Sequence, residues 1–236
     1  MELTFKLACT RGRGDDNFHI STPLVELKTG DILALTGPSG SGKSTILEIL
    51  GLVLKPEADS HFVWESGDDS LDIVKLWAQN NEQPLAELRA NNLGFVLQSG
   101  GLVPFLNVRE NIALPRLLAG MSKWHEHVDE LIEKLGITHL LTKKPHQLSV
   151  GERQRTAIAC ALAQEPSLLL ADEPTAALDP ARAEIVMKLL IDLVLARQGM
   201  AVIVTHDCDL IRRLDLQEMR AVLHPGGKAA VFSHVS

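Results

Sequence analysis

The chain has 236 residues, of which 45% are hydrophobic and 22% charged, and its formal net charge is −7. This length fits one domain with room for an inserted subdomain. The negative charge argues against nucleic acid as a partner, because phosphate binding needs a basic face. No apolar run of about 18 residues exists, so we expect no membrane span. Three widely spaced cysteines and an N-terminus without a signal-peptide pattern favour a soluble intracellular protein.

The first 36 residues predict short strands that lead into the clearest motif of the chain. Residues 31–36 predict a buried strand, and apolar residues between Ile46 and Leu54 recur on one helix face. Between them lies the phosphate-binding pattern G-x-x-x-x-G-K-[ST]. It comprises nine consecutive residues, which are Gly37, Pro38, Ser39, Gly40, Ser41, Gly42, Lys43, Ser44 and Thr45.

This motif predicts a nucleotide-binding loop, called the P-loop from here on. Glycines let backbone N–H groups turn toward phosphate oxygens, and the following helix N-terminus adds a partial positive charge. We expect Lys43 to reach the β- and γ-phosphates, and the Ser44 hydroxyl to hold Mg²⁺. A chance glycine turn is the alternative, which the flanking strand and helix disfavour.

Beyond the P-loop the pattern is less regular. Residues 55–92 are polar, and the acidic stretch 65–70 predicts a solvated loop rather than a cation site. Gly94–Leu97 predicts a short strand ending at Gln98, and we expect a loop and a short helix over 102–115.

Residues 123–136 predict an amphipathic helix, since apolar residues recur at helical spacing until Gly136. His125 and His127 are two positions apart on this helix. Their side chains are therefore expected to lie on different faces, which argues against a metal site there.

Another helix begins near residues 148–152. Ser149 and Glu152 form an S-x-x-E capping box, in which the serine accepts from the Glu152 backbone and the glutamate reaches back. The helix is expected to continue to about Glu165, where Pro166 ends it.

The last third of the chain alternates strands with helices, which predicts a parallel, helix-covered sheet. We expect a buried strand over 167–171, a helix over 185–193 and a second buried strand over 201–204. Residues 220–235 predict a terminal hairpin.

Polar side chains directly follow the predicted strands. The P-loop, Gln98, Asp172 with Glu173, and His206 all stand at strand ends, where open parallel sheets bind ligands. They are expected to form one polyphosphate site. Asp172 fits a second Mg²⁺ ligand, and His206 a hydrogen bond to the γ-phosphate. Glu173 fits a base facing an attacking water, because successive side chains diverge at a strand end.

Together these residues resemble the nucleotide-binding domain of an ATP-binding-cassette (ABC) ATPase, from about Leu3 to Arg213. The resemblance is made specific by the family's signature motif, Leu148–Glu152, which lies between Gln98 and the predicted strand that leads into Asp172. It implies a single domain over 1–236 with an α/β P-loop NTPase fold. That fold has a mainly parallel core sheet, an N-terminal antiparallel β subdomain and an inserted helical subdomain at about 85–165.

The resemblance also implies residue roles. Gln98 becomes the Q-loop glutamine, a further Mg²⁺ ligand and a member of the catalytic set with Glu173 and His206. In the signature, Ser149 and Gly151 would contact ATP. The segment Ala177–Asp179 would be the family's D-loop, and its Asp179 would make a third ATP contact.

The implied assembly is a head-to-tail dimer, in which each of two ATP molecules lies between the P-loop of one copy and the signature motif of the other. The second ABC domain is expected to be another copy of the chain. A different chain with its own ABC domain would also complete the two ATP sites. An integral-membrane permease would contact the helical subdomain. The chain would then lie peripherally on the cytoplasmic face of the inner membrane.

Residues 93–119 and the stretch ADEPTAALD resemble the ATPases of lipoprotein-releasing and macrolide-exporter systems, and also the cell-division ATPase of that group. Residues 60–85 match no part of the pattern. The leading hypothesis is an ATPase driving a transporter or mechanotransmission complex. The alternative is a nucleotide-gated regulatory or cell-division signalling module with slow hydrolysis. A nucleic-acid or ribosome-associated ATPase is disfavoured, because the acidic chain lacks tandem domains.

Two departures from the family bear on function. The signature is LSVGE where the family usually has LSGGQ, so Val150 adds bulk and Glu152 adds negative charge near phosphate. The family usually stacks adenine on an aromatic residue upstream of the P-loop. The matching loop here holds Arg11 and Arg13, and Phe18 is the nearest aromatic. An arginine plane is a possible substitute.

Overall fold

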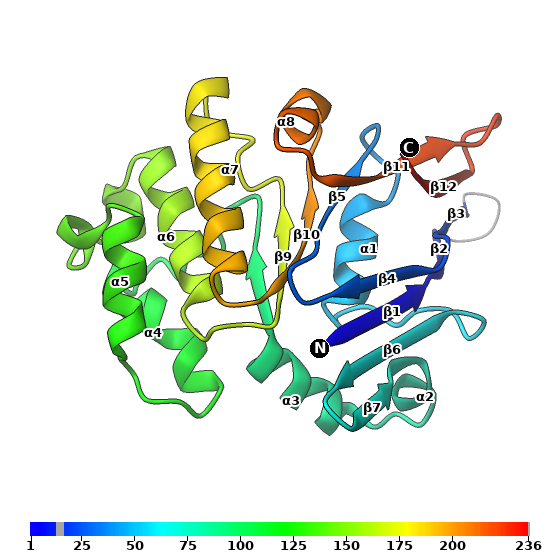
Figure 1. The fold of residues 1–236 in the computed structure, drawn as a ribbon, viewed down its shortest axis with the longest axis horizontal. Coiled ribbons are helices and arrows are strands. Elements are labelled where there is room, and N and C mark those ends of the chain that lie inside the picture. The colour runs from blue at the N-terminus through cyan, green and yellow to red at the C-terminus, as the bar shows by residue number, and fades with distance from the viewer. Residues whose placement is uncertain (13–16, 236) are drawn as a thin grey trace. The chain divides into compact units, whose positions relative to one another are not determined.

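The structure is a computed structural model that describes residues 1–12 and 17–235. The chain divides into two compact units, namely unit 1, Met1–Ala86 with Val202–Ser236, and unit 2, Glu87–Ala201. The boundaries fall inside helix α3 (Glu82–Asn92) and strand β10 (Met200–Val204). Figure 1 shows the helices and strands of both units.

The N-terminal part of unit 1 is a four-stranded antiparallel sheet with the order β4-β1-β6-β7. Its strands are β1 (Glu2–Lys6), β4 (Val25–Lys28), β6 (His61–Ser66) and β7 (Asp69–Asp72). Alternate residues face the core, so Leu3 and Phe5 of β1 are fully buried, as is Phe62 opposite Phe5. This sheet is the expected antiparallel β subdomain.

The prediction of a loop over residues 65–70 is wrong. Glu65 and Ser66 end β6, and only Gly67 and Asp68 connect it to β7 in a tight hairpin. Gly67 has a φ of 61°, which suits a short hairpin turn. Asp72 then caps helix α2 (Ile73–Ala78) by accepting from the Lys75 backbone N–H at 3.0 Å. The segment that matched no family pattern thus extends the antiparallel sheet.

The rest of unit 1 contains a second run of strands in the order β2-β3-β12-β11-β5. The strands are β2 (Ala8–Arg11), β3 (Phe18–Ser21), β12 (Ala229–His234), β11 (Gln217–Leu223) and β5 (Ile32–Thr36). The antiparallel pair β11–β12 confirms the predicted terminal hairpin, and β11 runs parallel to β5. All five residues of β5 are buried, as the apolar run predicted. Two helices complete the unit, α1 (Lys43–Leu50) and α8 (Cys208–Arg213).

Unit 2 combines two parallel strands with four helices. The strands are β8 (Leu93–Val96) and β9 (Leu168–Asp172), and the helices are α4 (Val108–Leu118), α5 (Glu126–Lys134), α6 (Val150–Leu162) and α7 (Pro180–Leu195). Short 3₁₀ turns lie at Thr138–Leu140 and Pro145–Gln147. Helix α6 packs closely on β8: a Cβ on Gly94 would lie 2.3 Å from the Ala161 carbonyl oxygen. Only glycine fits this contact.

Helix α5 begins later than the sequence predicted. His125 is its N-cap residue, in an extended conformation with φ −145° and ψ 155°, and only His127 lies in the helix. The expectation that the two histidines face apart is therefore wrong. Their Nδ1 atoms are 3.3 Å apart, because a helix periodicity does not apply across an N-cap.

Among the described residues, no helix is both long enough and apolar enough to cross a membrane.

Candidate nucleotide-binding site

The P-loop conformation depends on its glycines. Gly37, Gly40 and Gly42 have φ values of 132°, 77° and 89°, which residues with a Cβ rarely adopt. Gly37 also lies against β11, where an added Cβ would be 2.8 Å from the Cβ of Ala221. The loop therefore needs glycine both for backbone rotation and for close packing.

Lys43 closes over its own loop. Its Nζ donates to the backbone oxygens of Gly37 and Pro38, both at 2.9 Å, and the residue is 5% exposed. These contacts hold a positive charge directly above the turn. A bound anion would therefore meet the ammonium group without a large rearrangement of the lysine.

The beginning of helix α1 is suited to a phosphate group. Its N-cap residue is Gly42, which has no side chain to cap the first-turn N–H groups. The first-turn residues Lys43, Ser44 and Thr45 bring no carboxylate. Among the described residues, the buried Ser41 Oγ has no hydrogen-bond partner. The phosphates of a nucleotide would fit here, because the site offers the uncapped N–H groups of α1, the Lys43 ammonium and the Ser41 hydroxyl.

His206 lies near the P-loop in unit 1. The Thr205 backbone N–H donates to the Leu35 carbonyl at 3.1 Å, so β10 ends beside β5, the strand that precedes the P-loop. The exposed His206 comes next, and Asp207 fixes the turn by capping α8. The structure thus brings the histidine and the P-loop to the ends of neighbouring strands.

Gln98, Asp172 and Glu173 stand at the ends of two paired strands in unit 2. Strands β8 and β9 run parallel with Val96 opposite Ala171, so the residues that follow both strands emerge at one edge. Gln98 is exposed, and both carboxylate residues are half-buried. The structure therefore supports the proximity that the sequence predicted for these three.

The reason given for the direction of Glu173 needs correction. Strand β9 ends at Asp172, and Glu173 has a φ of 49°, in the left-handed region. The alternation of a strand therefore does not reach Glu173, and a turn directs its side chain. A left-handed residue with a Cβ carries about 1–2 kcal/mol of strain, and such strain clusters at functional sites.

The signature segment forms the predicted capping box at the start of α6. The Ser149 backbone N–H donates to Glu152 Oε2 at 2.7 Å, and the Glu152 N–H donates to Ser149 Oγ at 3.3 Å. The backbone hydrogen bond from Ser149 lowers the pKa of Glu152, with help from the Ser149 hydroxyl and from Lys143. Glu152 therefore stays ionised at this helix end.

Two neighbours of the capping box complete this surface of unit 2. Val150, the first residue of α6, is 46% exposed. Gly151 faces the side chain of Leu178, where an added Cβ would lie 3.5 Å from Leu178 Cδ2. That distance is an ordinary van der Waals contact, so packing in the isolated chain does not by itself require glycine at this position.

Asp179 has a structural role that the sequence prediction missed. Its carboxylate accepts from the Arg182 backbone N–H at 3.1 Å and caps α7. The signal was present, because an aspartate followed by Pro180 is a typical helix start. This cap fixes the end of the D-loop and is compatible with an ATP contact.

The two candidates for adenine stacking that the structure describes lie side by side. Arg11 and Phe18 are cross-strand partners in the β2–β3 pair, and Arg11 forms an ion pair with Glu48 of α1. Arg13, the third candidate, lies outside the described residues. Antiparallel partners lie within about 5.5 Å of each other, so Phe18 is placed as well as Arg11 to stack on adenine.

Comparisons with known proteins agree with this set of features. The ABC transporter family model matches residues 22–176, well over half of the chain. The lipoprotein-releasing system ATP-binding protein LolD 1 of Rhodospirillum rubrum is 44% identical over 193 residues, 81% of each chain. The LolD protein of Legionella pneumophila strain Lens is 42% identical over 220 residues, covering 89% of this chain and 92% of its own.

A solved structure extends the likeness to three dimensions. It is a dimeric ATP-binding cassette in a post-hydrolysis state, bound to ADP and phosphate. The TM-score is 0.78 at 30% identity, and the match covers 93% of this chain and 94% of the other.

The chain belongs to the ABC transporter family, whose ATP-binding subunits hydrolyse ATP to power transport. The predicted resemblance to ABC ATPases and the predicted P-loop NTPase fold are thus confirmed. The extent of the helical subdomain, 85–165, and the individual site residues stay predictions.

Proposed function

We propose that this chain is the ATPase subunit of a lipoprotein-releasing transporter, acting peripherally at the cytoplasmic face of the inner membrane with an integral-membrane permease. The relatives named for lipoprotein release support this proposal through their identity over most of both chains. ATP-driven motion would pass to the permease, since the described residues include no membrane-crossing helix. The regulatory or cell-division alternative finds no support among these relatives.

The working unit is proposed to be a head-to-tail dimer of two copies. The P-loop of one copy would hold ATP, and Ser149 and Gly151 of the other copy would contact the γ-phosphate, with Asp179 nearby. The dimeric ATP-binding cassette among the structural neighbours supports such a pairing. The exposed position of Ser149 at a helix N-terminus also supports it.

Within each copy, Ser44, Gln98 and Asp172 are proposed to hold Mg²⁺. Hydroxyl, amide and carboxylate oxygens are the ligands that this hard cation prefers. When bound, Mg²⁺ neutralises charge on the phosphates. The Lys43 ammonium binds and orients the phosphates.

Glu173 is proposed to accept the proton of the attacking water, and His206 to hydrogen-bond the γ-phosphate. The observation that carries the assignment is the left-handed backbone at Glu173, directly after the strand that ends in Asp172. Nothing in the P-loop supplies a carboxylate base, because its nine residues contain no acidic side chain. The carboxylate base must therefore come from outside the P-loop, and Glu173 is the residue proposed for it.

The test is ATP turnover by the purified chain, wild type against Glu173→Gln, with and without Mg²⁺. We expect the variant to lose about 10²- to 10⁴-fold in turnover, as for removal of a positioned base. Its affinity for ATP should persist, because the P-loop is untouched. Glu184→Gln is the control, since that half-buried carboxylate pairs with Lys188 on α7. Equal turnover by wild type and Glu173→Gln would reject the assignment.

A further inference from the structure

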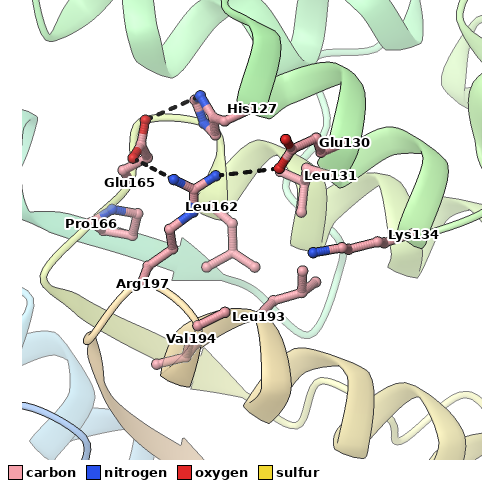
Figure 2. Close-up of a pocket in the computed structure, with 11 residues that line it drawn as sticks. His127, Glu130, Leu131, Lys134, Leu162, Glu165, Pro166, Leu193, Val194 and Arg197 are labelled. Atoms are coloured by element: carbon pink, nitrogen blue, oxygen red, sulfur yellow. Dashed lines mark hydrogen bonds and ion pairs between the residues drawn. The ribbon is translucent and has the colours of Figure 1, made fainter.

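A histidine and glutamate cluster lies in unit 2, apart from the residues assigned to nucleotide. His125 and His127 stand at the start of α5, and Glu165 lies in the turn after α6. One ligand atom from each residue falls within 4.8 Å of the other two. Figure 2 shows the His127 imidazole facing the Glu165 carboxylate, with Arg197 on the other side of that carboxylate.

The spacing of the ligand atoms fits one small cation. His127 Nδ1 is 3.3 Å from His125 Nδ1 and 3.1 Å from Glu165 Oε1. In a tetrahedral zinc site, bonds of about 2.0–2.1 Å place neighbouring ligand atoms about 3.3–3.4 Å apart. These two distances match the edges of such a tetrahedron, and the ligand atoms of His125 and Glu165 lie within 4.8 Å of each other.

The surroundings hold these groups in place. His127 is 6% exposed, so burial restricts its ring. Among the described residues its Nε2 atom has no hydrogen-bond partner, so no hydrogen bond orients the ring on that side. Arg197 donates from Nη1 to Glu165 Oε2 at 3.1 Å and lies 3.8 Å from Glu130 (Figure 2). The arginine thus fixes the far oxygen of Glu165 and leaves Oε1 directed at His127. Hydrogen bonds of this kind orient the ligands of metal sites.

The Glu165 backbone is also committed to this position. Its φ is 55°, in the left-handed region, and its N–H donates to the Leu162 carbonyl at 3.0 Å. Left-handed residues also follow helices α2, α7 and α8, and here the residue forms the turn after α6. The turn directs the side chain back toward the start of α5.

We propose that His125, His127 and Glu165 form a binding site for a divalent transition metal, for which Zn²⁺ is the best match. Two imidazoles and one carboxylate suit Zn²⁺ better than Mg²⁺, which prefers oxygen ligands. His125 and Glu165 are exposed, so the fourth position would face solvent and take water. This site is independent of the proposed ATPase function.

The bound metal would join two segments of unit 2. It would connect the N-terminus of α5 to the turn that precedes Pro166, and strand β9 begins two residues beyond that proline. Strand β9 ends at Asp172. Metal binding would therefore restrain the segment that enters this strand.

The experiment is a titration of the full chain, stripped of metal and nucleotide, with Zn²⁺ in excess Mg²⁺. Excess Mg²⁺ occupies oxygen-rich sites and leaves the histidine cluster free. We expect one Zn²⁺ per chain, and a loss of at least about tenfold in affinity for His125→Ala and for Glu165→Gln. His224→Ala, which removes an exposed histidine of unit 1, should bind as the wild type does.

Cobalt identifies the ligands by a second readout. Co²⁺ in the wild type should give the visible spectrum of tetrahedral nitrogen and oxygen ligation, which His125→Ala abolishes. His125 also caps α5 through its side chain, so His125→Ala should melt slightly below the metal-free wild type but still cooperatively, which distinguishes a lost ligand from a lost fold. The proposal is overturned if Zn²⁺ fails to saturate at one per chain. Equal affinity in His125→Ala and wild type, or a cobalt–thiolate band, would also overturn it.

Discussion

Two helix N-termini in this protein are built in opposite ways. Helix α1 starts at Gly42, which offers no cap, and the Lys43 ammonium stands above its first turn. Helix α6 starts at Ser149 with a complete capping box, in which the ionised Glu152 satisfies the Ser149 backbone N–H. The N-terminus of α1 is therefore available to an anion, whereas the Glu152 carboxylate already occupies the N-terminus of α6.

This difference separates two tasks that both use helix N–H groups. An uncapped helix N-terminus destabilises the nucleotide-free protein but binds phosphate tightly, because its N–H groups have no intrahelical acceptors. A capped terminus is stable by itself and gains less from an incoming phosphate. We infer that the P-loop supplies most of the nucleotide affinity. The signature would then contribute a weaker contact that closes the dimer.

The largest effect should come from the open terminus. Lys43→Ala removes the cation above the P-loop, and we expect a loss of at least about 100-fold in ATP turnover. Nucleotide affinity should fall as well, which fluorescence titration with a labelled ATP analogue would measure. Lys28→Ala, on an exposed strand position, is the matched control. Unchanged turnover in Lys43→Ala would remove the distinction between the two termini.

The capped terminus should respond in a different way. Ser149→Ala removes an N-cap and should lower the free energy of unfolding by about 1 kcal/mol. Urea denaturation of the nucleotide-free chain would measure that loss. Nucleotide affinity of a single copy should stay near the wild-type value. If that affinity falls as far as in Lys43→Ala, the signature is as important for binding as the P-loop.

A smaller change tests the charge alone. Glu152→Gln keeps the capping geometry, since glutamine also completes a capping box, but removes a negative charge beside the proposed γ-phosphate contact. We expect ATP-driven dimerisation to strengthen by about 1.5- to fivefold, the range of a weak exposed electrostatic contact. A weaker dimer in Glu152→Gln would show that the carboxylate assists closure.

The same carboxylate predicts a pH dependence. The pKa of Glu152 lies below its ordinary value of 4.5 in the folded chain, so its capping stabilises the protein above that value. This contribution should disappear as pH falls through the lowered pKa. Thermal melts of wild type and Glu152→Gln should therefore converge in acid and differ near neutrality. A difference that grows in acid would contradict the capping role.

The smallest effect is expected at Val150. Val150→Gly restores the residue that the family usually has, at the price of up to about 1 kcal/mol of helix stability. Because the side chain is 46% exposed, its removal leaves no cavity in the isolated chain. Dimerisation in ATP should strengthen by a factor of a few, measured against Glu152→Gln under identical conditions. No gain would mean that valine is accommodated at the interface.

Local motifs account for most of what the sequence could predict. Strands β5, β9 and β10 appear as continuous apolar runs because both of their faces are buried. The β6–β7 hairpin was missed, since its acidic residues around Gly67 resemble a solvated loop. The start of α5 was misplaced because the N-cap role of His125 depends on its extended backbone.

The same division applies to the site. The P-loop and the Ser149–Glu152 box are each encoded within a few residues, so spacing alone predicts them. The partners of Lys43, Gly37 and Pro38, lie in the same loop. The left-handed backbone at Glu173 follows from no residue pattern. The histidine cluster was also not predicted, because Glu165 lies far along the chain from His125 and His127 and only packing brings them together.

The most direct test of the account is the oligomeric state of Glu173→Gln, measured by analytical ultracentrifugation in Mg-ATP, in Mg-ADP and without nucleotide. The account predicts a dimer in ATP alone, because the variant binds but does not hydrolyse, and a monomer once Lys43→Ala is added. A monomer in ATP at every protein concentration would contradict it. So would a dimer that forms equally well without nucleotide.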